Sequence, residues 1–188
     1  MFEDLVEKIE DLLLKQPNVA VAISGFAGSG KSTLADKIRD HFKISDGQVI
    51  RIDNLYNSRP RNSGLLDDYD WPLLQRILKR AHSGERLNYD TRGYEGESIV
   101  INEELPRVLV VEGVQLIRQE LLNSFDLTVW VGCPLDEAIE RAKKRDLEQD
   151  NGDEYMELWD AVWAPRNKEY FSNYQPDELA DFLYLEYK

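Results

Sequence analysis

The chain has 188 residues, which is enough for one domain with a sizeable core. Its formal net charge of −13 argues against a broad nucleic-acid-binding surface, and its 42% hydrophobic content is typical of a soluble globular protein. One cysteine cannot form an internal disulfide, the acidic start (1–4) is unlike a secretory signal, and no apolar run reaches membrane-spanning length. We expect a cytoplasmic protein that binds neither nucleic acid nor a membrane; homo-oligomerisation is left open.

The N-terminal segment 1–18 is predicted to form a helix. Apolar residues recur at helical spacing over residues 2–16, and Pro17 with Asn18 ends the pattern. Its apolar face is expected to pack on the rest of the domain.

The next segment carries the most specific motif of the chain. Residues 25–32 fit G-x-x-x-x-G-K-[ST], the phosphate-binding loop (P-loop), between an apolar strand at 19–24 and a helix that starts near Thr33. Glycines allow the backbone N–H groups to turn toward an anion, and the start of the helix favours the same charge. The motif predicts ATP binding through Gly25, Ala27, Gly28, Ser29, Gly30, Lys31, Ser32 and Thr33. Lys31 would contact the β- and γ-phosphates, and Ser32 would ligate Mg²⁺.

Two carboxylates stand at the ends of further predicted strands. The strand at 48–52 leads into Asp53, and the strand at 107–113 carries Glu112 near its end. In open α/β sheets this edge binds ligands, and a carboxylate there can either accept a proton from a bound molecule or hold Mg²⁺. Ser32, Asp53 and Glu112 are the predicted metal-binding set. The sequence does not assign the two roles, and Asp53 could instead cap a helix.

The remaining segments alternate between helix and strand patterns. Residues 88–96 show no clear periodicity, and the short strand at 98–101 is expected outside the main sheet. Further elements are predicted as helices at 72–81, 116–122, 134–145 and 154–172, the last interrupted by Pro165, and as strands at 127–131 and 182–186. One α/β domain with a parallel sheet accounts for residues 1–188.

Several motifs, in this order, resemble the uridine kinase/phosphoribulokinase family of P-loop kinases. They are the P-loop itself, Asp53-Asn54-Leu55-Tyr56, Tyr69-Asp70-Trp71-Pro72, the segments 110–113 and 141–146, and the ending 165–170 with 181–184. The resemblance implies a P-loop NTPase three-layer sandwich, with a five-stranded parallel sheet and helices on both faces. It also implies an acceptor-binding insert at 54–104 and a cationic lid at 136–153.

The same resemblance implies an ATP- and Mg²⁺-dependent kinase that phosphorylates a hydroxyl group of a small molecule. The implied catalytic residues are Lys31, Asp53, Glu112, Arg141 and Arg145, and the implied acceptor-binding residues are Asp53, Tyr56, Asp70 and Tyr89. Two arginines four residues apart can equally form a solvated face paired with Glu137 and Glu148, and Asp70 can simply initiate a turn. The acceptor stays open among a nucleoside, a sugar and a vitamin precursor. An ATPase and a non-catalytic nucleotide switch are the alternatives.

Overall fold

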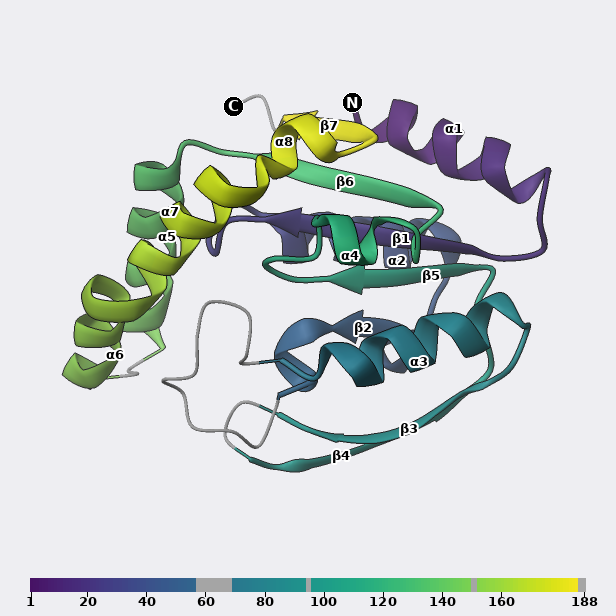
Figure 1. Ribbon diagram of the computed structural model, residues 1–188, viewed down its shortest axis with the longest axis horizontal. Coiled ribbons are helices and arrows are strands. Elements are labelled where there is room, and N and C mark those ends of the chain that lie inside the picture. The colour runs from purple at the N-terminus through teal and green to yellow at the C-terminus, as the bar shows by residue number, and fades with distance from the viewer. Residues whose placement is uncertain (57–68, 94–95, 150–151, 186–188) are drawn as a thin grey trace.

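The computed structural model describes residues 1–56, 69–93, 96–149 and 152–185. Its centre is a sheet of five parallel strands in the order β2-β5-β1-β6-β7 (Figure 1), which confirms the predicted sheet. These strands are β1 (Val19–Gly25), β2 (Val49–Arg51), β5 (Val108–Glu112), β6 (Leu127–Gly132) and β7 (Phe182–Leu185). Because β1 lies in the middle, the loop that follows it opens between the ends of two neighbouring strands.

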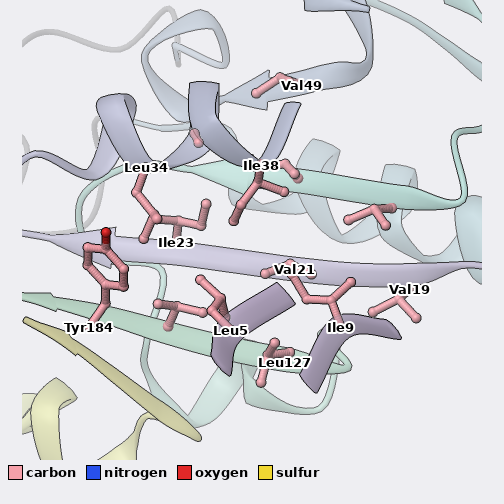
Figure 2. Packing of buried hydrophobic residues seen from close by; sticks show 14 of the residues in the cluster. Leu5, Ile9, Val19, Val21, Ile23, Leu34, Ile38, Val49, Leu127 and Tyr184 are labelled. Atoms are coloured by element: carbon pink, nitrogen blue, oxygen red, sulfur yellow. The ribbon is translucent and has the colours of Figure 1, made fainter. Parts of the chain in front are cut away.

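Helices cover both faces of this sheet because successive side chains of β1 point to opposite sides. Val19, Val21 and Ile23 face α1 (Phe2–Leu13) and α2 (Lys31–Phe42), whose leucines and isoleucines pack on them (Figure 2). Ala20 and Ala22 face the opposite cluster, which includes side chains of α3 (Trp71–His82) and α4 (Gln119–Leu122). Both clusters are buried, so the start of α2 is held firmly behind the P-loop.

A separate two-stranded sheet lies beside α3. It pairs β3 (Leu87–Arg92) with β4 (Ser98–Glu103) in antiparallel fashion, so the strand expected outside the main sheet is confirmed. Residues 88–96 show no clear periodicity in the sequence, yet the first part of this segment belongs to β3. Leu87 and Tyr89 are buried and Asn88 and Asp90 exposed, which is the alternation of a half-buried strand.

The C-terminal third is a set of helices that ends in β7. It contains α5 (Leu135–Glu148), α6 (Gly152–Leu158), a π-helical turn (Trp159–Trp163), α7 (Ala164–Tyr174) and α8 (Pro176–Leu179). The α-helical pattern is interrupted beside Pro165, as expected: the π-helical turn ends directly before α7, and Pro165 stands in the first turn of α7. The first helix of the chain ends earlier than predicted, at Leu13. Within the described ranges, no helix is both long and apolar enough to cross a bilayer.

Candidate active site

The P-loop has the backbone geometry that its glycines predict. Gly28 and Gly30 adopt positive φ angles of 86° and 96°, and α2 begins at Lys31 directly after them. A Cβ atom on Gly28 would lie 2.0 Å from the carbonyl oxygen of Ala138 on α5. Glycine is therefore required there both for the left-handed backbone and for the close approach of α5.

Glu112 joins the P-loop to the neighbouring strand. It is opposite Ile23 in the register of β1 and β5, only 5% exposed, and accepts a hydrogen bond of 3.2 Å from the Ser32 hydroxyl through Oε1. Its second oxygen, Oε2, is buried and has no hydrogen-bond partner. Burial raises the pKa of Glu112 above its ordinary value of 4.5, nearby Lys31 opposes this increase, and the Asp53 carboxylate adds to it. These interactions bring together the predicted Lys31, Ser32, Asp53 and Glu112.

Asp53 lies on the other side of this group, in a short 3₁₀-helix (Ile52–Asn54) after β2. It does not cap that helix, so the alternative structural role considered from the sequence is wrong. Its Oδ1 atom accepts a 3.0 Å hydrogen bond from the Tyr69 hydroxyl, and the Tyr69 ring packs edge-on against Tyr56 at 5.4 Å. Asp53 and Tyr56 are thus joined through a tyrosine that sequence reasoning did not select.

The other predicted acceptor residues have structural contacts. Asp70 caps α3 by accepting a 2.9 Å hydrogen bond from the backbone of Leu73, in line with the simpler interpretation of that residue. Tyr89 lies in the buried cluster beneath α3, where burial raises the pKa of its hydroxyl to about 12. A role for either residue toward an acceptor stays a prediction.

The two arginines of the predicted lid are paired with carboxylates of their own helix. Arg141 contacts Glu137 at 2.5 Å, and Arg145 contacts Asp146 at 2.9 Å. Asp146 is buried and also accepts a 2.7 Å hydrogen bond from the indole of Trp159. The carboxylate that binds Arg145 is therefore itself held in position. Whether either arginine reaches phosphate stays a prediction.

Two further features beside these residues were not predicted. A cavity of about 600 Å³ lies next to the P-loop, lined mainly by Phe26, Trp130, Cys133, Pro134, Leu135 and Phe171. Arg118, on the loop after β5, is 5% exposed and stacks on the ring of Trp71 at 3.9 Å. Neither follows from a local motif, because each depends on residues brought together by the sheet.

The oxygen atoms around Ser32 fit a magnesium ion carried by a nucleotide. The Ser32 hydroxyl contacts the Glu112 carboxylate, and Asp53 is near enough to raise the pKa of Glu112. The unpaired Oε2 of Glu112 is a buried acceptor that a cation would satisfy. Across the described ranges, no three His, Cys, Asp or Glu side chains form a cluster of the kind that cages a metal.

Comparisons with known proteins agree with this geometry. A family model described as NB-ARC domain matches residues 2–59, which include the P-loop. The chain is 30% identical over 148 residues to a uridine kinase from Geobacillus kaustophilus, with 72% of this chain and 70% of that protein covered. A uridine kinase from Clostridium novyi is 28% identical over 144 residues, covering 70% and 69%.

Solved structures share the fold over nearly the whole chain. A candidate fructose transport system kinase from Silicibacter sp. TM1040 has a TM-score of 0.78 at 21% identity and covers 98% of both chains. A candidate uridine kinase from Bacillus stearothermophilus has a TM-score of 0.61 at 16% identity, covering 96% of this chain and 99% of the other. By its sequence relatives and its P-loop fold, the chain belongs to the uridine kinase family of P-loop kinases and is a small-molecule kinase.

Proposed function

We propose that the protein transfers the γ-phosphoryl group of ATP to a hydroxyl group of a small molecule. The observation that carries this proposal is the pairing of Ser32 with buried Glu112 on one side and the exposed Asp53 on the other. A phosphate-binding group and an exposed carboxylate at neighbouring strand ends suit in-line phosphoryl transfer, which depends on positioning and charge more than on covalent chemistry.

Lys31 and the P-loop backbone bind the phosphates in this proposal. Lys31 is 9% exposed, so its ammonium group acts where water screens it little. Charge that builds up on the transferred group is then stabilised by a cation already in place.

Ser32, Glu112 and Asp53 would hold Mg²⁺, directly or through water. When bound, the ion would neutralise phosphate charge and align the β- and γ-oxygens. The Ser32 hydroxyl donates a hydrogen bond to Glu112, so the lone pairs of the Ser32 oxygen remain available to a cation. Glu112 therefore belongs with the metal rather than with the acceptor.

Asp53 takes the proton of the acceptor hydroxyl. Its Oδ1 atom is engaged by Tyr69, which fixes the carboxylate and leaves Oδ2 for the acceptor. The apolar cavity beside Phe26 suits the base of the nucleotide, because aromatic and aliphatic side chains line most of it.

The acceptor is a nucleoside, a sugar, a hydroxy acid or a vitamin precursor such as pantothenate. Relatives are named uridine kinase, and a structural neighbour with a TM-score of 0.64 and 13% identity is a D-glycerate 3-kinase from Cryptococcus neoformans. These names describe those proteins and supply the first compounds to try.

The test is ADP release from ATP with and without a panel of such alcohols. We expect release to depend on one class of alcohol and Asp53→Asn to lower kcat by about 100-fold or more. Asp40→Asn, a change on the exposed side of α2, is the matched control and should leave turnover unchanged. ADP release without any alcohol would identify an ATPase, and nucleotide binding without turnover would identify a switch.

A further inference from the structure

The end of β5 and the loop that follows it carry three buried polar atoms that lack hydrogen-bond partners. They are Oε2 of Glu112, Oε1 of Gln115 and Nε of Arg118, on side chains that are 5%, 8% and 5% exposed. Gln115 also has a φ of 63°, which is uncommon for a residue other than glycine. Folded proteins pair nearly all buried polar groups, and strained backbone conformations are concentrated at functional sites. Both features of this segment are therefore typical of a ligand-binding site.

Of the two charged residues in this group, Glu112 has a proposed role in metal binding, and Arg118 has no role in the proposed function so far. It forms no ion pair with any carboxylate in the part of the chain that the structure describes. Burial lowers the pKa of its guanidinium, and the Glu120 carboxylate, which is near but not in contact, opposes this decrease. A buried cation without a partner is unfavourable, so an anion that reached it would bind strongly.

A series of side-chain contacts connects Arg118 to Asp53. Its guanidinium carbon lies over the Trp71 ring, 3.9 Å from the ring centre. The Trp71 ring packs against Tyr69 at 5.3 Å, and Tyr69 donates its 3.0 Å hydrogen bond to Asp53. The Tyr170 hydroxyl donates to the carbonyl of Ile117 at 2.6 Å and fixes the loop from the side of α7. Figure 1 shows that α3 begins at the same end of the sheet at which β5 ends.

Stacking on Trp71 determines how Arg118 can recognise a ligand. When the face of a guanidinium lies on an aromatic ring, its N–H donors point outward in the plane of the group. Two of these N–H groups can donate hydrogen bonds to two oxygen atoms of a carboxylate or a phosphate. The guanidinium has no acceptor atom, so it cannot accept a hydrogen bond from a neutral hydroxyl group.

We propose that Arg118 binds an anionic group of the acceptor, so that the substrate is an alcohol that also carries a carboxylate or a phosphate. This inference rests on the proposed kinase function and names its substrate class. The competing explanation is that Arg118 only supports Trp71 and the start of α3.

Matched pairs of acceptors separate these explanations: glycerol with D-glycerate for a carboxylate, and D-ribose with D-ribose 5-phosphate for a phosphate. We expect the wild-type protein to use the charged member of one pair at least about 10-fold better in kcat/KM. Arg118→Met should lower kcat/KM for that compound by about 10- to 100-fold, chiefly through KM, and leave KM for ATP unchanged. Arg118→Lys should retain part of the preference, because it keeps the charge but loses the planar fork.

Arg76→Met is the matched control, since Arg76 is an exposed arginine on α3, the helix that Trp71 begins. It should behave as wild type. A preference of the wild-type protein for both neutral compounds would overturn the proposal. So would an equal loss on charged and neutral compounds in Arg118→Met, which would mark a structural role.

A binding measurement keeps the inference testable if no alcohol supports ADP release and the proposed function fails. D-glycerate and inorganic phosphate are titrated calorimetrically into protein whose P-loop is filled with a non-hydrolysable ATP analogue. Binding to wild type and Arg76→Met, but at least about 10-fold weaker binding to Arg118→Met and partial recovery in Arg118→Lys, would support the anion site. Equal binding, or none, by all four proteins would overturn it.

Discussion

At the scale of single residues, the candidate site depends on charged groups held where water is scarce. Glu112 illustrates this: its burial is unfavourable for the ionised form, yet Ser32 and Lys31 both act to keep it ionised. Such a residue is retained for chemistry rather than for stability, because an uncharged isostere would fit the same space at lower cost.

Replacement of Glu112 by glutamine should therefore separate stability from activity. Because the pKa of Glu112 is raised in the folded protein, the folded protein keeps a proton that the unfolded chain releases near pH 4.5. The contribution of Glu112 to the free energy of unfolding therefore decreases as the pH rises from 4.5 through the raised pKa. Glu112→Gln should be at least as stable as wild type at pH 7.5, while kcat falls by about 100-fold or more. Urea unfolding at pH 4.5 and pH 7.5 measures the first effect, with Glu10→Gln on the exposed side of α1 as control. A mutant that is less stable than wild type only at pH 7.5 would contradict this account.

Lys31 provides the second test at this scale. Lys31→Ala removes the cation that we propose binds the phosphates, and we expect kcat to fall by about 1,000-fold or more with the fold intact. Circular dichroism and thermal unfolding check the fold, and ADP release checks turnover. Near-normal turnover would place the phosphates elsewhere.

At the scale of elements, α5 connects the P-loop to the rest of the C-terminal helices. Ala138 and Ala142 lie against Gly28, and farther along Asp146 is held by Trp159. An exposed pair at i,i+4 such as Arg141 with Glu137 is worth about 0.3–0.5 kcal/mol, so a phosphate can easily displace Glu137. Arg145 is less free to move, because its partner Asp146 is buried.

The two arginines should therefore differ when each is replaced by alanine. Arg141→Ala is expected to lower kcat/KM by about 100-fold with little change in stability, since a phosphate contact is lost. Arg145→Ala should change turnover less but cost about 1 kcal/mol of stability, because the buried Asp146 loses a partner. Lys144→Ala is the control, as Lys144 is exposed and only 3.9 Å from the exposed Glu148. The reverse order of effects would assign phosphate binding to Arg145.

Closure of the lid can be followed by hydrogen exchange over residues 136–149. Amides near Ala138 should be protected without nucleotide, because α5 already contacts the P-loop there. A non-hydrolysable ATP analogue should add protection toward Leu147, which is 59% exposed. Equal exchange with and without the analogue would remove support for a moving lid.

At the scale of the whole molecule, parallel strands bring the site residues to one edge of the sheet. The P-loop, Asp53 and Glu112 follow β1, β2 and β5, and that much could be predicted, because each stands at the end of an apolar run. β3 was missed because only Leu87 and Tyr89 mark its buried face. Arg118 was missed because its significance comes from burial against Trp71, a contact 47 positions apart in sequence that no local pattern encodes. The partners of the lid arginines depend on rotamers and on Trp159, which periodicity does not specify.

Binding of nucleotide should stabilise the whole domain, because the P-loop joins β1 to α2 across the main core. A ligand at 100 times its Kd adds about 2.7 kcal/mol, which raises Tm by about 5–10 °C for a chain of this size. We expect this shift with ATP and Mg²⁺, a smaller one with ATP and EDTA, and almost none in Lys31→Ala. EDTA alone should leave Tm unchanged, since the proposed Mg²⁺ ion arrives with ATP and is shared between its phosphates and Ser32. Unfolding of the nucleotide-free protein by EDTA would mean that a metal supports the fold itself, and the assignment of Ser32, Asp53 and Glu112 to a nucleotide-borne ion would be wrong.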